Sequence, residues 1–140
     1  MIRAVICILT NQDNKVLFVR RSIHRKNLPG LWALPAGMVQ VKETPPQAVE
    51  REFLEEFWIK VKKPVLLEKL VEEEEGRGEI EKYLYQVKAK SSLDNIRFNL
   101  VEADGAIFLT FKEFYSLFAD KETGFILRYL RRKYKQFGLK

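Results

Sequence analysis

Residues 37–59 decide the fold, and they read Gly37-Met-Val-Gln-Val-Lys-Glu43-Thr-Pro-Pro-Gln-Ala-Val-Glu-Arg51-Glu52-Phe-Leu-Glu55-Glu56-Phe-Trp-Ile59. The second half of this stretch predicts a helix from Pro45 to about Phe57. Thr44 can cap the N-terminus of that helix, and Gln47, three residues later, completes a capping box. Proline suits the first helical turn, because an amide there has no partner inside the helix.

The predicted helix has an apolar face and a carboxylate face. Glu52, Glu55 and Glu56 fall within an arc of roughly 100° beside the apolar stripe. Neighbouring carboxylates repel one another, and a bound cation removes that cost. Hard oxygen ligands favour Mg²⁺, or Mn²⁺, whereas Zn²⁺ prefers Cys and His, which this stretch lacks. A solvated helix face is the alternative, because 31% of all residues are charged. The apolar stripe consists of Val49, Phe53 and Phe57.

The spacing within this stretch resembles the signature of the Nudix hydrolase family. The preceding run from Gly30 to Gly37, Gly-Leu-Trp-Ala-Leu-Pro-Ala-Gly, is similar to the family's usual lead-in. The resemblance covers residues 1–60 and is weaker beyond them. It implies the Nudix α/β/α sandwich with a mixed sheet, whereas the residue pattern alone indicates only an α/β or α+β protein. The positions that carry the signature are Gly37, Glu43, Arg51, Glu52, Glu55, Glu56 and Ile59.

One residue departs from the family pattern. Trp58 stands where the family has the glycine that ends the helix in a left-handed conformation. A bulky residue adopts that conformation only at a cost in free energy. We therefore expect this helix to end differently and the following loop to take another path.

The resemblance implies roles for the charged residues of the signature. We expect Glu52 and Glu56, one turn apart, to be the primary metal ligands, with Glu55 as a second-metal ligand or the general base. By analogy with the family, Arg51 orients the glutamates through a salt bridge with Glu43.

The resemblance also implies contributions from outside the helix. A main-chain carbonyl near Ala36 or Gly37 is expected to be a further metal ligand, and Gly37 lets the backbone approach the site closely. Glu102 is a candidate for a glutamate that reaches the metal from a later loop, with an exposed loop acid as the alternative. The general base stays open among Glu52, Glu55 and Glu102.

Basic residues in the loop before the signature are candidates for substrate binding. Arg21 and Arg25 could bind phosphate oxygens, because an arginine offers two parallel hydrogen bonds to such a group. In enzymes of similar layout, the arginine that matches Arg21 faces the substrate's phosphates. The alternative is a solvated basic loop. His24, the only histidine, is more simply an exposed loop residue than a general base.

Length and composition limit the possible classes. A chain of 140 residues predicts one domain, here residues 1–140. No apolar run is long enough to span a membrane, and the start lacks the pattern of a signal peptide. A single cysteine excludes an intrachain disulfide framework. A cytoplasmic location is the resulting expectation.

The net charge of +6 comes from the C-terminus. Residues 128–140 contain six basic side chains and no acidic one, so the remainder balances at 19 of each sign. This end predicts a helix from Glu122 to about Phe137, following a helix from Phe111 to Ala119. The six basic residues are Arg128, Arg131, Arg132, Lys133, Lys135 and Lys140.

The remaining segments predict strands. Residues 2–10 and 15–21 are expected to form a hairpin, and 61–72 and 79–90 another. Short strands are expected at 32–34 and 38–41, around a turn at 35–37, and at 106–109. The acidic run of the second hairpin is most simply a solvated surface. By the resemblance, this region instead shapes a substrate pocket or a homodimer contact.

The expected activity is metal-dependent hydrolysis of a diphosphate linkage in a nucleoside diphosphate derivative, with water as the nucleophile. The opening of the chain is most similar to the mutator-type nucleoside triphosphate hydrolases, although ADP-ribose and nucleotide sugars stay open. Two alternatives are a catalytically weak nucleotide- or RNA-binding module that uses the basic C-terminal helix, and a regulatory protein with a vestigial site.

Overall fold

The computed structural model describes residues 1–26, 28–89, 97 and 103–140. The chain forms two compact units, of which the first comprises residues 1–9 and 35–97 and the second residues 10–34 and 98–140. The single domain expected for residues 1–140 stays a prediction. Within the described ranges, no helix combines the length and the apolar character needed to cross a membrane.

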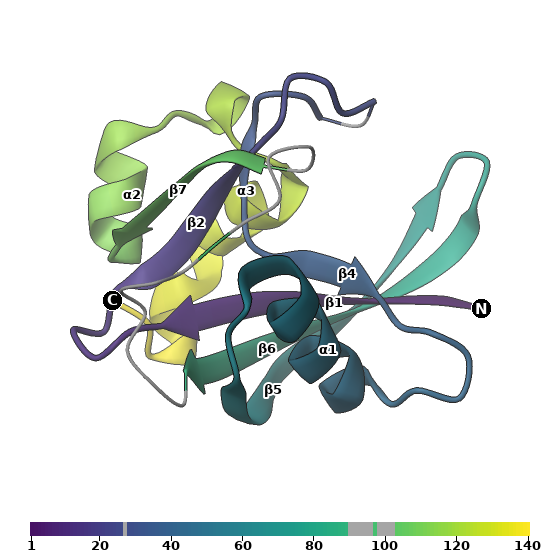
Figure 1. Ribbon diagram of the computed structural model, residues 1–140. Coiled ribbons are helices and arrows are strands. Elements are labelled where there is room, and N and C mark those ends of the chain that lie inside the picture. The colour runs from purple at the N-terminus through teal and green to yellow at the C-terminus, as the bar shows by residue number, and fades with distance from the viewer. Residues whose placement is uncertain (27, 90–96, 98–102) are drawn as a thin grey trace. The chain divides into compact units, whose positions relative to one another are not determined.

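The first unit is a mixed sheet with one helix. Strand β6 lies between β1 and β5, and it is antiparallel to β5. Figure 1 shows β6 running in the same direction as β1, while β4 is antiparallel to β1, with Val5 opposite Gly37. The elements are β1 (Ile2–Thr10), β4 (Ala36–Met38), α1 (Pro45–Phe57), β5 (Val61–Glu74) and β6 (Gly78–Ala89).

Helix α1 begins as the capping box predicts. The Thr44 hydroxyl accepts a hydrogen bond from the Gln47 amide at 3.3 Å, and the Gln47 side chain accepts one from the Thr44 amide at 2.9 Å. The predicted apolar stripe is buried, with Phe53 and Phe57 in ring contact at 5.6 Å. The helix is therefore held by its apolar face, and its carboxylate face is left available for chemistry.

The prediction that Trp58 changes the end of this helix is wrong. Trp58 adopts the left-handed conformation, with φ 57° and ψ 36°. Its amide donates to the Leu54 carbonyl, and the Ile59 amide donates to the Phe53 carbonyl, as in a glycine-ended helix. The Arg97 guanidinium lies 4.8 Å from the Trp58 ring centroid, and such a cation–π contact offsets part of the strain.

This cap makes a prediction about stability. Because only a Cβ makes the left-handed conformation costly, Trp58→Gly should unfold with a free energy about 1 kcal/mol higher than Trp58→Ala. Both variants lose the ring, so the difference isolates the backbone strain. Urea unfolding of the two variants measures it, and equal stabilities would contradict the strained cap.

A second expectation is wrong between residues 35 and 41. Ala36 and Gly37, expected in a turn, instead lie in strand β4, and residues 39–41 lie outside any strand. Pairing with β1 extends the backbone here, since Ile6 stands opposite Ala36 and the Cys7 amide donates to the Pro35 carbonyl at 2.9 Å. The glycine at position 37 thus lies in a paired strand.

The second unit is built around strand β2, which pairs with both β3 and β7 in antiparallel fashion. The first hairpin is confirmed, since Thr10 at the end of β1 pairs with Val16. Aromatic rings fill the interior, with Phe18 stacked on Phe114 at 4.0 Å and edge-on to Phe111 at 5.4 Å. The elements are β2 (Val16–Arg21), β3 (Trp32–Ala33), β7 (Ala103–Leu109), α2 (Phe111–Leu117) and α3 (Phe125–Lys133).

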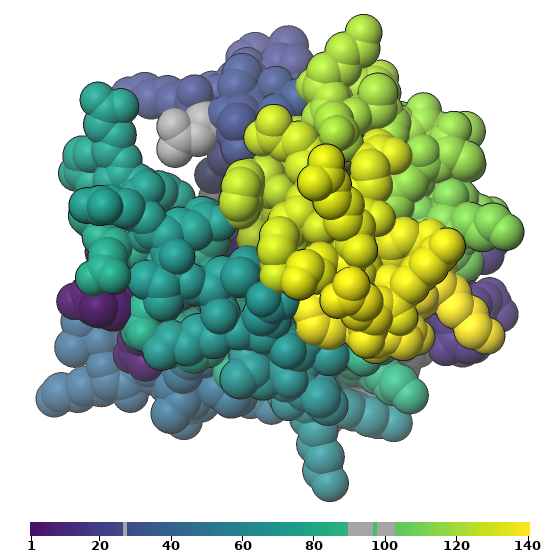
Figure 2. Space-filling model, turned by 180° about the vertical axis from the view of Figure 1, so that it is seen from behind, coloured from purple at the N-terminus to yellow at the C-terminus, as the bar shows by residue number. Residues whose placement is uncertain are grey.

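The C-terminal helix is shorter than expected. A 3-10 turn occupies Asp120–Glu122, α3 begins only at Phe125, and a second 3-10 turn covers Tyr134–Phe137. Helix α3 starts later than expected because the residues before it pair with strand β3. Thr123 bridges to Trp32, and the Gly124 amide donates to the Trp32 carbonyl at 2.9 Å. Figure 2 shows this C-terminal segment (yellow) at the surface.

Candidate active site

The candidate site lies in the first unit, where one arginine gathers the carboxylates of the signature. Arg51 donates from Nε and Nη2 to the two oxygens of Glu43, at 2.7 and 3.0 Å. Its Nη1 donates to Glu52 at 2.9 Å and to Glu55 at 3.3 Å. The second Nη2 bond goes to the main-chain carbonyl of Met38 at 2.8 Å. Every N–H of the guanidinium therefore has an acceptor.

These contacts fix both the charge and the position of Arg51. The hydrogen bonds to Glu43 first, and then those to Glu52, raise the pKa of Arg51 above its usual value. The side chain is 19% exposed. Arg51 is therefore a permanent cation that ties helix α1 to the segment between β4 and α1.

Glu43 is held from two sides. In addition to the two bonds from Arg51, it accepts a hydrogen bond from the Gln40 amide at 3.0 Å, and its side chain is 13% exposed. The bond from Arg51 lowers the pKa of the Glu43 carboxyl, and the Gln40 amide adds to that effect. Glu43 thus serves to position Arg51 and keeps its charge well into acid.

This pKa shift predicts a pH dependence of stability. A carboxyl with a lowered folded-state pKa contributes fully above the unfolded value of about 4.3 and loses its contribution as the pH falls through the folded value. Glu43→Gln should therefore lower the free energy of unfolding by about 1–2 kcal/mol at neutral pH and by less as the pH drops below 4.3. Denaturant unfolding from neutral to acid pH tests this, with Glu73→Gln, an exposed β5 carboxylate, as control. A deficit independent of pH would contradict it.

Glu52 lies directly against the backbone of β4. A Cβ added to Gly37 would overlap Cγ and Cδ of Glu52. Only glycine leaves room for this carboxylate. The sequence predicted that Gly37 allows a close approach of the backbone to the site, but it did not identify Glu52 as the residue in contact. The backbone of β4 and the carboxylate of α1 therefore form one continuous surface.

Glu55 and Glu56 complete the carboxylate face. The side chain of Glu55 is 57% exposed and touches Arg51 only at 3.3 Å. Glu56 is half-buried and is engaged in an interaction of its own. Glu43, Glu52 and Glu55 share one arginine, so a net negative charge remains on this face.

The donors on this face fit a hard divalent cation. They are carboxylates beside an open main-chain strand, and Ala36 of that strand is exposed. The nearby Cys7 is no competing ligand, because burial first, and the negative charge of Glu52 second, raise the pKa of its thiol. Across the described ranges, however, no three His, Cys, Asp or Glu side chains come close enough to hold one ion. The ligand set of Glu52, Glu56, Glu55 and Ala36 therefore stays a prediction.

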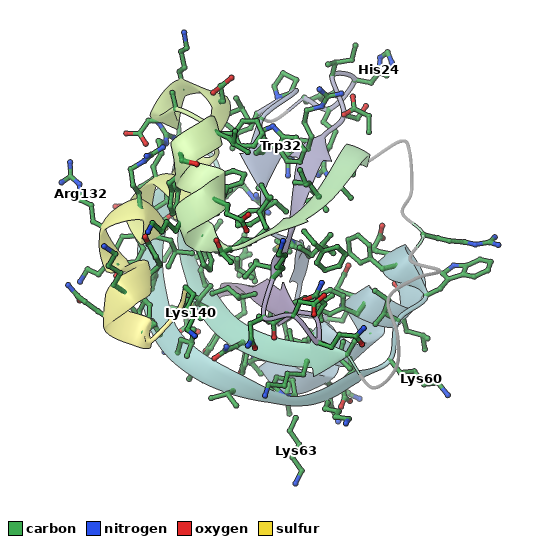
Figure 3. All side chains as sticks on the ribbon, turned by 90° about the vertical axis from the view of Figure 1, so that its left-hand side faces the viewer. His24, Trp32, Lys60, Lys63, Arg132 and Lys140 are labelled. Atoms are coloured by element: carbon green, nitrogen blue, oxygen red, sulfur yellow. The ribbon has the colours of Figure 1, made fainter. Side chains whose placement is uncertain are left out.

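The basic residues expected to bind substrate lie in the second unit. Arg21 and Arg25 are half-buried and each makes interactions. His24 is exposed, as expected, and its amide donates to the Ser22 hydroxyl at 3.2 Å; Figure 3 shows its side chain at the outer end of this loop. Glu102 lies outside the described residues.

Three contacts of the site were not anticipated. The Met38 carbonyl and the Gln40 amide bind Arg51 and Glu43 through the backbone, and main-chain atoms leave no signal in residue types. The Arg3 guanidinium also donates to the Glu43 carbonyl at 3.1 Å. A lone arginine in an apolar strand could have suggested a partner, but not which one.

Comparison with known proteins identifies the family of this chain. The model of the NUDIX domain matches residues 1–129, and solved structures show the same fold. The MutT protein from Methanosarcina mazei Go1 superposes with a TM-score of 0.76 at 19% identity, covering 98% of this chain and 92% of the other. A NUDIX hydrolase from Nitrosomonas europaea gives 0.74 at 18% identity, covering 96% and 88%.

A MutT NUDIX hydrolase from Burkholderia pseudomallei gives a TM-score of 0.68 at 21% identity, covering 79% of this chain and 84% of the other. No curated protein matches the chain. The fold is thus an α+β sandwich with a mixed sheet, as expected. The chain belongs to the NUDIX family, and it is a Nudix hydrolase.

Proposed function

We propose that this enzyme hydrolyses the diphosphate linkage of a nucleoside diphosphate derivative, with Mg²⁺ or Mn²⁺ as cofactor and water as the nucleophile. The observation that carries the proposal is the carboxylate face of α1, where Glu52 and Glu55 are both held by Arg51. Membership of the NUDIX family gives the hydrolase class, and the carboxylates suit the divalent cation that such a substrate requires.

Each residue of the site has a proposed role. Glu52 and Glu56 would hold the cation, with a main-chain oxygen near Ala36. When bound, a divalent cation neutralises charge on the diphosphate and makes a water molecule more acidic. Glu55 is exposed and loosely paired, whereas Glu52 and Glu56 are half-buried. It would accept the proton from the attacking water. Arg51 and Glu43 act as positioning residues.

Substrate phosphates need cations as well as metal. Arg21 and Arg25 supply guanidinium groups that suit phosphate oxygens. The nucleoside part of the substrate is open among nucleoside triphosphates, ADP-ribose and nucleotide sugars. The homodimer and the cytoplasmic location expected from the sequence likewise stay predictions.

A substrate panel tests the proposal. Phosphate or nucleotide release should be measured from nucleoside triphosphates, ADP-ribose, nucleotide sugars and dinucleoside polyphosphates, with and without Mg²⁺. The expected result is metal-dependent cleavage of at least one member, at a P–O–P bond. A second arm with Arg21→Gln should raise KM for that member far more than it lowers kcat. Absence of cleavage across the panel with metal bound would contradict the proposed substrate class.

The rival reading, a binding module that uses the basic C-terminal helix, finds less support. Arg131 is engaged internally, since it donates to Asp120 at 2.7 Å and to the Phe118 carbonyl at 2.6 Å. Lys133 and Lys135 lie over tyrosine rings, 5.7 and 5.9 Å from the centroids. Much of the basic charge of this segment therefore serves the fold.

A further inference from the structure

A basic and aromatic surface follows the end of helix α1, outside the carboxylate face. Its residues are Trp58, Lys60, Lys62, Lys63, Lys88 and Arg97, here called the Trp58 surface. The side chain of Trp58 is among the most exposed large apolar groups of the chain, at 68%. All five cations are exposed as well, and Figure 3 shows Lys60 and Lys63 pointing outward from the fold in different directions.

The cations of the Trp58 surface form no ion pairs with the acidic residues that the structure describes. Within the described part of the chain, none of the five forms an ion pair. The same hairpin pairs its cations elsewhere, since Lys69 contacts Glu81 and Lys82 contacts Glu72. Among the described residues of this hairpin, the cations without an ion pair therefore lie at the start of β5 and the end of β6.

Two local features here are unfavourable for the free protein. Lys62 stands directly opposite Lys88 in the β5–β6 register, and like charges in that position repel. Trp58 is held in the left-handed conformation that disfavours a bulky residue. Residues in strained backbone conformations cluster at functional sites, including those that hold a ligand. Negative charge on a ligand relieves the repulsion between Lys62 and Lys88, and the exposed indole of Trp58 offers a flat face on which a ring can stack.

The arrangement around the indole identifies the kind of ligand. The Arg97 guanidinium lies over the Trp58 ring at 4.8 Å, and the Arg97 amide donates to the Phe57 carbonyl at 3.3 Å. A guanidinium stacked on an exposed indole suits insertion of a nucleobase beside it, with phosphates reaching the lysines. A membrane would instead have to take up the guanidinium together with the ring, which opposes insertion.

We propose that the Trp58 surface binds single-stranded nucleic acid, with Trp58 stacking on a base and Lys60, Lys62 and Lys63 neutralising backbone phosphates. Lys60 to Lys63 extends over at most about 11 Å of chain, which suits successive phosphates of a flexible strand. The surface lies outside the proposed catalytic residues, so the inference does not depend on the hydrolase substrate. It goes beyond hydrolysis, because it gives the enzyme a binding surface for a polymer.

Binding of a fluorescein-labelled oligouridylate tests the inference, in EDTA so that no hydrolysis intervenes. Trp58→Gly, which keeps the left-handed cap, should weaken binding roughly 5- to 150-fold, whereas Trp58→Phe should restore most of it. The double change Lys62→Gln and Lys63→Gln should reduce the slope of log K against log salt by about 1.4. Indole fluorescence should be quenched on binding in the native chain and much less in Trp58→Phe.

A matched control separates this surface from the C-terminal helix. The double change Arg128→Gln and Arg132→Gln removes the same charge from exposed positions of α3 and should leave the affinity unchanged apart from a small long-range effect. Weakening by this control alone would overturn the inference. The inference would also be overturned if Trp58→Gly bound oligouridylate as tightly as the native chain does, and if the two proteins also bound inorganic polyphosphate equally. The surface would then recognise charge alone. Binding to phosphatidylserine vesicles but not to oligouridylate would overturn it in favour of a membrane surface.

Discussion

Glu56→Gln and Glu52→Gln should each lower kcat on the cleaved substrate by about 100-fold or more, since each removes a proposed metal ligand. In the absence of metal, the free energy of unfolding should be the same or higher, because repulsion among the helix carboxylates is relieved. Steady-state kinetics with saturating Mg²⁺ and urea unfolding in EDTA measure the two effects. The combination of lost activity with retained stability distinguishes a catalytic role from a structural one.

Helix α1 offers a matched control for this prediction. Glu50 is an exposed carboxylate on the same helix. It lies about 160° around the helix axis from Glu52, away from the carboxylate face. Glu50→Gln removes the same charge and should retain nearly full activity. Retained activity in both Glu52→Gln and Glu56→Gln would contradict the assignment of the metal ligands.

Gly37→Ala should be as damaging to activity as removal of the Glu52 charge, although it adds only a methyl group. The added Cβ would overlap the Glu52 side chain, so the carboxylate has to leave its place against β4. Its flexible end can swing away, and the backbone at Gly37 does not have a positive φ. We therefore expect a loss of kcat of about 100-fold with a loss of stability of at most about 1 kcal/mol.

A double-mutant cycle gives this second prediction its control. If Gly37→Ala acts by displacing Glu52, then Gly37→Ala combined with Glu52→Gln should be no slower than Glu52→Gln alone. Losses that multiply would show that Gly37 acts through another contact, and full activity of Gly37→Ala would show that Glu52 need not lie against β4.

The sequence predicts helix α1 well, because the determinants of this helix are local. The capping box of Thr44 and Gln47 and the stripe through Phe53 depend only on spacing along one helix. The ion pair between Arg51 and Glu43 followed from the family resemblance, and it is present at 2.7 Å. The hairpin of β1 and β2 likewise depends on a short turn.

The errors arise where contacts distant in sequence decide the conformation. Strand β4 forms because β1 pairs with Gly37, and the start of α3 is delayed because Thr123 and Gly124 bind Trp32. At Trp58, a propensity argument predicted another helix end, but the amide bonds of the cap and the stacked Arg97 hold the left-handed conformation. Such partners cannot be identified from one sequence.

The dependence of the hydrolysis rate on free Mg²⁺ tests most directly whether the carboxylates of α1 hold the metal. It should be measured for the native chain and Glu56→Gln, with the best substrate of the panel. We expect no turnover in EDTA, a saturable rise with Mg²⁺ in the native chain, and for Glu56→Gln a much lower maximum reached only at higher Mg²⁺ concentration. The same rate in EDTA as in Mg²⁺, or identical metal dependence of the two proteins, would contradict a metal held by the carboxylates of α1.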